Sequence, residues 1–125
     1  MILGFTGTQK DVTGKQFDAM LTLVTELRPT EIHHGDCVGA DHRFHQLCEW
    51  LNSMNPNYQI EIHIHPPTNE SKRKFCVGDV EHPPKDYIVR NHDIVDASDV
   101  VIAVPPTTKE LQRSGTWSTW RYAKK

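Results

Sequence analysis

The sequence predicts a three-layer α/β fold, in which helices cover both faces of a short parallel sheet. Strand-like and helix-like segments alternate along its 125 residues in the order βαβαβ, a loop, then αβα, which is typical of parallel sheets with right-handed crossovers. The runs at 2–5 and 100–104 are apolar throughout and predict strands buried on both faces. The run at 59–65 alternates apolar and polar residues and predicts an edge strand. Numbered in chain order, the four predicted strands fit the order 3-2-1-4.

Capping signals and periodicity predict the helices. Thr13 and Gln16 form an S/T-x-x-E/Q capping box, and apolar residues then recur every three or four positions as far as Leu27. Residues 68–83 show no clear periodicity and predict a long loop, and loops of this length are often functional. The whole chain, 1–125, is expected to form one domain. The predicted elements are strands at 2–5, 31–34, 59–65 and 100–104, and helices at 13–27, 44–54, 84–97 and 114–123.

Composition and charge argue against several classes of protein. The 14 basic and 16 acidic residues give a net charge of −2, whereas duplex binding depends on clustered Lys and Arg. The longest apolar run, at 100–104, has five residues, and a membrane span needs about 20. The first residues, 1–7, contain no basic leader, so we expect a cytoplasmic protein. Three cysteines, an odd number with no CxxC pair, predict free thiols.

The eight histidines raise the question of a metal site. His33 and His34 are adjacent on a predicted strand, so their rings are expected on opposite faces of the sheet. His63 and His65 share a face, but the spacing shows no third ligand. The sequence therefore predicts neither a metal nor a cofactor. Cys37 is interpreted as a small loop residue rather than a reactive thiol.

Glycine-containing loops follow three of the predicted strands. The carboxyl ends of parallel strands meet at one edge of a sheet, and ligands bind there. Glycines let the backbone approach a ligand, and helix N-termini present free N–H groups to anions. The pattern fits a nucleotide or phosphate site, or else ordinary turns, and it contains neither G-x-G-x-x-G nor a Walker loop. The three loops are 6–9, 34–41 and 105–116.

Four segments are specific when they are taken together and in this order. They are Gly4-Phe5-Thr6-Gly7-Thr8, His34-Gly35-Asp36-Cys37-Val38-Gly39-Ala40-Asp41, Tyr87-x-x-Arg90-Asn91-x-x-Ile94-Val95 and Ser114-Gly115-Thr116-Trp117. This set resembles the SLOG superfamily, a Rossmann-like group that includes the Lonely Guy phosphoribohydrolases, the DNA-processing protein A fold and sensor domains of bacterial antiphage systems. The resemblance covers nearly the whole chain and is strongest to the small stand-alone SLOG proteins of bacteria and phages.

The resemblance implies a Rossmann-like domain that binds a nucleotide or a nucleotide-derived small molecule. Asp41 either holds ribose hydroxyls or caps the following helix. Arg90 either faces the ligand or forms a surface ion pair, and Asn91 either contacts the ligand or satisfies backbone groups. Trp117 either stacks on a base or packs in the core. The ligand-binding residues that the resemblance implies are Gly7, Thr8, Gln9, Gly35, Asp36, Gly39, Ala40, Asp41, Arg90, Asn91, Pro105, Ser114, Gly115, Thr116 and Trp117.

The chain departs from the hydrolase branch of this superfamily. That branch has one or two Glu within three residues of its Gly-Thr pair, where this chain has Ser118 and Thr119, and neither side chain can act as a carboxylate acid or base. Gln9 stands where family members often have Arg, and the P-G-G segment is absent. The sequence therefore favours a non-catalytic sensor or sponge for a signalling nucleotide. The alternative is a nucleotide-processing enzyme, such as an N-glycosidase, whose carboxylate is Asp36, Asp41 or Glu110.

The sequence also predicts self-association. The resemblance implies a further strand beside 100–104, and no residues remain for one after the last helix. The 100–104 strand would then be an apolar edge without a charged residue, and such edges invite pairing. We expect a dimer that covers this edge or, alternatively, the loop at 105–113 folded over it. Aromatic residues expected in a dimer interface are Trp117, Trp120 and Tyr122.

Overall fold

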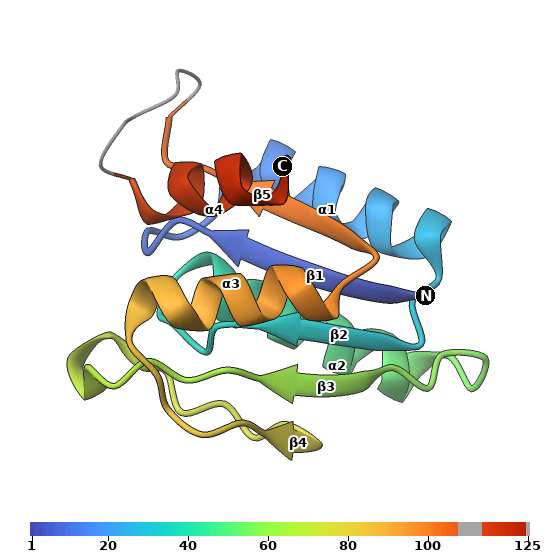
Figure 1. The fold of residues 1–125 in the computed structure, drawn as a ribbon. Helices are drawn as coiled ribbons and strands as arrows, with labels where there is room; N and C mark the ends of the chain where they lie inside the picture. The colour runs from blue at the N-terminus through green and yellow to red at the C-terminus, as the bar shows by residue number, and fades with distance from the viewer. Residues whose placement is uncertain (108–113, 125) are drawn as a thin grey trace.

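The computed structural model describes residues 1–107 and 114–124. Within these residues, one parallel sheet has the strand order β4-β3-β2-β1-β5 (Figure 1). The predicted three-layer α/β fold is confirmed, as is the relative order of the four predicted strands. The strands are β1 (Ile2–Gly7), β2 (Glu31–His34), β3 (Glu61–Ile64), β4 (Val80–Glu81) and β5 (Val100–Val104).

Helices cover both faces of the sheet. In Figure 1, α3 and α4 lie in front of it, and α1 and α2 lie behind it. None of the helices in the described part of the chain is both long enough and apolar enough to cross a membrane. The helices are α1 (Gly14–Leu27), α2 (Ala40–Met54), α3 (Tyr87–Ala97) and α4 (Gly115–Ala123), with a short 3-10 turn at Glu70–Lys72.

Two local expectations about the middle of the chain are wrong. The segment 68–83 is not only loop, because it contains the 3-10 turn and β4. β4 pairs with β3, so β3 is not an edge of the sheet. A strand of two residues is too short to show a period of two in the sequence, and tertiary pairing alone holds it in place. His82, just after β4, continues this pairing by donating its N–H to Ile64 O at 2.9 Å.

The start of α1 forms as its sequence predicts. Thr13 Oγ1 accepts from the N–H of Gln16 at 3.1 Å, and Gln16 Oε1 accepts from the N–H of Thr13 at 2.9 Å. This reciprocal capping box satisfies two N–H groups that the first turn would otherwise leave free. At the other end, Arg28 has a φ of 48° and turns the chain toward β2.

The two faces of the sheet differ in chemistry. Along β1, Leu3 and Phe5 are fully buried on the α1/α2 side, where the Phe5 ring stacks on Phe44 at 4.2 Å. Gly4 points the other way, and a Cβ there would collide with Ser98 at the end of α3, so α3 packs directly on the β1 backbone. The apolar core lies on the α1/α2 side, and its buried members are Leu3, Phe5, Met20, Val24, Ile32, Ala40, Phe44, Leu47, Cys48, Leu51, Ile60, Ile62, Ile64, Ile102 and Val104.

A buried carboxylate fastens the long β3–α3 connection to the end of β2. Asp36 is fully buried, and its φ of 52° turns the chain away from the strand. Its two oxygens accept from Arg73 Nε at 2.7 Å and from the N–H of Cys76 at 2.8 Å. Its own N–H donates to His34 Nδ1 at 2.9 Å. Asp36 therefore acts as an anchor for the loop rather than as an open ligand-binding group.

Arg73→Met should destabilise the fold by about 3 kcal/mol, because it leaves the buried Asp36 carboxylate without its cationic partner. The matched control is Lys74→Met, which removes a neighbouring exposed charge and should change the free energy of unfolding by no more than about 0.5 kcal/mol. Urea unfolding measures both variants. Equal losses in the two variants would contradict the anchoring role of Asp36.

Candidate functional site

The loops that follow β1, β2 and β5 join at the carboxyl edge of the sheet, as the strand order predicts. Ala40 N donates to Thr8 O at 2.9 Å, and Thr8 N donates to Val104 O at 2.8 Å. Gly39 has a φ of 91°, and a Cβ at this position would collide with the Gln9 backbone. Only glycine adopts this conformation readily, so the close approach of the first two loops requires it.

Two residues of the predicted site serve helix packing. A Cβ on Gly7 would collide with the Cβ of Ala40. The small size of both residues lets the first turn of α2 lie against the end of β1. Their role in any ligand site is therefore to set the position of the loops.

A cleft of about 390 Å³ opens at this edge. Its lining comes from the β1 loop, the β3–α3 connection and the first residues of α3 and α4. Two residues of the predicted site, Gln9 and Gly115, line it. The full lining is Gln9, Pro67, Thr68, Asn69, Lys72, Asp86, Tyr87 and Gly115.

The last predicted loop forms the start of α4. Ser114 is the N-cap, and its hydroxyl accepts from the N–H of Trp117 at 3.4 Å. Thr116 is buried, and Pro105 is half-buried at the end of β5. The indole of Trp117 donates to Thr107 Oγ1 at 3.2 Å and packs edge-on against Trp120. Trp117 does not line the cleft in this structure.

Arg90 is buried, so the alternative that it forms a surface ion pair is wrong. Its side chain is 3% exposed. Its Nη1 donates to Gly35 O at 2.5 Å and to His65 O at 3.2 Å, so it ties together the carboxyl ends of β2 and β3. The guanidinium also lies 4.7 Å from the ring centroid of Tyr87, a residue of the cleft lining. Asn91, likewise buried, follows it on α3.

Asp41 lies in the same buried polar layer. Gly39, not Asp41, is the N-cap of α2, so the capping alternative is wrong. Asp41 Oδ2 accepts from the N–H of Cys37 at 3.2 Å, whereas Oδ1 has no partner among the described residues, and neither has Arg90 Nε. Burial raises the pKa of Asp41 to about 6, although the charge of Arg90 acts in the opposite direction. Buried polar atoms without protein partners are commonly satisfied by water or a ligand.

The three carboxylates considered for catalysis have different outcomes. Both oxygens of Asp36 accept hydrogen bonds from the loop that it anchors. Asp41 keeps an oxygen without a described partner and a raised pKa. Glu110 lies outside the described residues, as do most residues of the 105–113 loop.

Sequence reasoning missed two cleft residues that have useful chemistry. Lys72 belongs to a basic cluster that looks like solvated surface, and Tyr87 has the spacing of an ordinary helix face. The structure brings both into the cleft because the β3–α3 connection folds back over the carboxyl edge. The sequence signals for this were the unusual length of the 68–83 segment and the place of Tyr87 at the start of one of the four characteristic segments.

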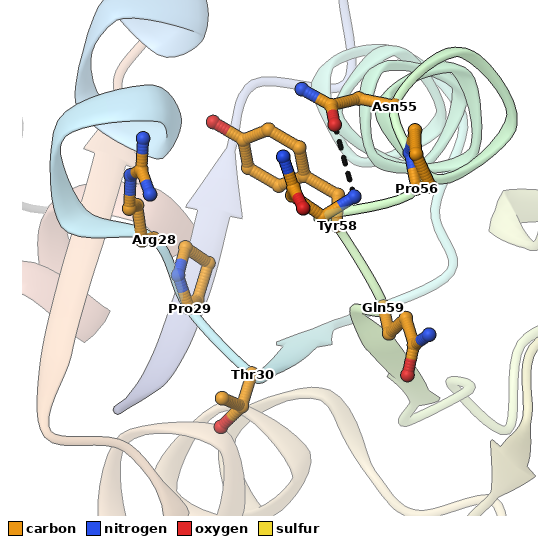
Figure 2. Close-up of a pocket in the computed structure, with 8 residues that line it drawn as sticks. Arg28, Pro29, Thr30, Asn55, Pro56, Tyr58 and Gln59 are labelled. Carbon is orange, nitrogen blue, oxygen red and sulfur yellow. Dashed lines mark hydrogen bonds between the residues drawn. The ribbon is translucent and has the colours of Figure 1, made fainter.

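A second hollow, of about 450 Å³, lies at the opposite edge of the sheet (Figure 2). Arg28 and Tyr58 face it from the turns that precede β2 and β3. It therefore lies at the amino ends of the strands, where ligands of parallel α/β sheets do not usually bind. We place the candidate site at the carboxyl edge.

Three groups of described side chains have ligand atoms close enough to hold a metal, all within 4.8 Å of one another in each group. None of these groups includes a residue that lines the cleft. The groups are His33, His65 and His82; His34, His45 and Cys76; and Glu31, His33 and His63.

The sequence matches no protein-family model, and no curated protein is significantly similar to it. Any function must therefore be argued from the residues of the chain and their geometry.

The free energy of unfolding of Asp41→Asn should increase relative to that of the wild type as the pH rises. The pKa of Asp41 is raised from 3.8 to about 6, so between these values the folded chain binds more protons than the unfolded chain and loses stability with rising pH. Asparagine does not titrate, so the difference in unfolding free energy should grow by up to about 3 kcal/mol between about pH 4 and pH 7.

Urea unfolding over this pH range measures the difference. Asp18→Asn, at an exposed position of α1, is the control and should follow the wild type. A difference between Asp41→Asn and the wild type that stays constant with pH would contradict a raised pKa.

Proposed function

We propose that this chain binds a nucleotide or a nucleotide-derived small molecule in the cleft at the carboxyl edge of the sheet. The observation that supports this most is the position and lining of the cleft. It lies where ligands of doubly wound sheets bind, and residues from three separate connections converge on it. Its volume, about 390 Å³, is within the range of small-molecule sites.

The lining offers contacts for the parts of such a ligand. Lys72 supplies a positive charge for a phosphate, and the start of α4 at Gly115 supplies backbone N–H groups. The Tyr87 ring offers an aromatic face for a base or a ribose. A Cβ on Gly115 would collide with the Tyr87 ring, so glycine is needed for α4 to begin this close to the ring.

Binding without catalysis is the favoured form of the proposal. Ser118 and Thr119 supply no carboxylate after the Gly115-Thr116 pair, and Asp36 is occupied by the loop that it anchors. A sensor or sponge for a signalling nucleotide needs only a site and no acid or base.

One observation favours the alternative, a nucleotide-processing enzyme. Asp41 combines burial, a pKa raised to about 6 and an oxygen without a described partner, which suits a general acid or base near neutral pH. Incubation with a panel of nucleotides, followed by chromatography, tests this. If the wild type releases a free base and Asp41→Asn does not, the protein is a nucleotide-processing enzyme. If the nucleotides stay intact, the result supports binding without catalysis.

Lys72→Ala should weaken nucleotide binding roughly ten- to hundred-fold, because a charge-assisted contact to phosphate contributes about 1.5–3 kcal/mol. Native mass spectrometry of the protein purified from cells would identify a retained ligand, and calorimetry with that nucleotide would then measure the change. Lys74→Ala, an exposed lysine outside the cleft lining, is the control and should bind like the wild type. Equal dissociation constants for the wild type and Lys72→Ala would contradict nucleotide binding in this cleft.

We also propose that the chain self-associates through β5. In the described structure β5 is the outer strand of the sheet, it contains no charged residue, and Val100 is 40% exposed. An apolar strand edge of this kind invites pairing with a second copy. The alternative cover, the 105–113 loop, lies largely outside the described residues.

Light scattering should give about twice the 14.3 kDa mass of one chain. Val100→Lys should shift the mass toward that of one chain, because a charged edge opposes strand pairing. Val77→Lys, at a position 85% exposed in the β3–α3 connection, should have no effect. A wild-type mass of one chain at micromolar concentration would contradict the dimer.

A further inference from the structure

Four histidines form a row on the α3-facing side of the sheet. The parallel register places His33 of β2 beside His63 of β3, and their ring centroids are 4.3 Å apart. His65 and His82, just after β3 and β4, stack at 4.0 Å with nearly parallel rings. His33 and His65 are buried, whereas His63 and His82 are half-buried. We call these four residues the histidine row.

Two glutamates orient one end of the row. The Nε2 of His33 lies 2.5 Å from Glu31 Oε2, and the Nε2 of His63 lies 2.5 Å from Glu61 Oε1. A neutral imidazole that donates from Nε2 has its lone pair on Nδ1. A carboxylate behind an imidazole in this way is a frequent arrangement at metal sites, where it sets the tautomer and the orientation of the ligating ring.

The Nδ1 atoms oriented by these glutamates point at further imidazole nitrogens. His33 Nδ1 lies 2.7 Å from His65 Nε2, and His63 Nδ1 lies 3.0 Å from His82 Nε2. Several ring nitrogens therefore converge from three strands.

We propose that His33, His65 and His82 form a binding site for a divalent transition-metal ion, with Zn²⁺ as the expected ion. One nitrogen from each ring lies within 4.8 Å of the others. Tetrahedral zinc with bonds of about 2.0–2.1 Å places neighbouring ligand nitrogens about 3.3 Å apart. The 2.7 Å between His33 Nδ1 and His65 Nε2 is shorter than this, so these two rings have to move apart slightly to bind one ion.

The donor set and the exposure define the kind of site. Three imidazoles without a thiolate suit Zn²⁺, Cu²⁺ or Ni²⁺ rather than Mg²⁺ or Ca²⁺. Three protein ligands leave a fourth position of a tetrahedral ion open for water. His82 is half-buried, so the proposed site lies next to solvent at this ring. A bound ion would link β2, β3 and the end of the two-residue β4.

The sequence alone showed no third ligand for the pair His63 and His65. In the structure His65 shares a group with His33 and His82 rather than with His63, because parallel pairing brings three strands together. His82 follows a strand that the sequence did not predict, and His33 lies on the neighbouring strand β2, whose register with β3 is set only in the folded sheet.

The group His34, His45 and Cys76 is less suited to a metal. His34 Nδ1 accepts from the N–H of Asp36 at 2.9 Å, so its hydrogen is on Nε2, which donates to His45 Nδ1 at 2.8 Å. His34 therefore has no ring lone pair left for a metal, whereas His33 donates from Nε2 to Glu31 and keeps the lone pair on Nδ1. His45 Nε2 in turn lies 3.3 Å from Glu49 on the surface, which makes these groups a chain of hydrogen bonds.

Zinc titration of the chelator-treated protein tests the proposal. Native mass spectrometry should show one Zn²⁺ per chain, and calorimetry should show an affinity that falls by more than about 100-fold in His82→Ala and by about 10- to 100-fold in Glu31→Gln. His82 is half-buried, so its substitution spares the apolar core. His42→Ala, which removes a half-buried histidine of α2 outside the row, is the control and should bind like the wild type.

Cobalt substitution tests the ligand set independently. Co²⁺ in a tetrahedral site of three imidazoles should give visible d–d bands and no thiolate-to-metal band in the near ultraviolet. A thiolate band would overturn the proposal, because it would indicate a cysteine ligand such as Cys76. Absence of zinc binding to the wild type, or zinc affinity that is unchanged in His82→Ala, would overturn it as well.

Discussion

The parallel pairing of β1 with β2 on one side and β5 on the other determines where the rest of the molecule can lie. The register pairs Leu3 with Ile32 and with Val100, and Gly4 with His33. Because side chains alternate along a strand, this register sends Leu3 and Ile32 to the α1/α2 side, and Gly4 and His33 to the α3 side. A slip by one residue would exchange the two sides and turn the apolar side chains of β2 away from the core.

The two sides of the sheet differ in role: one holds the apolar core, and the other holds the polar histidine row. The α1/α2 side holds the stacked rings of Phe5 and Phe44 and the rest of the apolar core, and burial of this surface is the main favourable contribution to folding. On the other side, Gly4 lets α3 approach the backbone, while the β2–β3–β4 part of the same side presents the histidine row. The proposed metal site and the proposed ligand cleft therefore arise from one sheet without sharing a lining residue.

Two aspartates near the end of β2 have different surroundings in the fold, and the sequence alone does not distinguish their roles. Asp36 has a partner for each oxygen and stabilises the loop around Arg73. Asp41 is nearly as buried, yet one of its oxygens has no partner among the described residues, and its pKa rises to about 6. Arg90 lies between the backbone of β2 and the Tyr87 ring.

The sequence by itself determined the alternation of the four predicted strands with four helices, the start of α1 at its capping box, the order of those strands in the sheet and the edge where the loops meet. Periodicity, caps and turn residues act over a few positions, so these features can be predicted locally. Only the tertiary structure decided that β4 exists, that Arg90 is buried, that Lys72 and Tyr87 line the cleft, and that His33 and His82 join His65. Each of these depends on the register or packing of segments far apart in the chain, which no local pattern specifies.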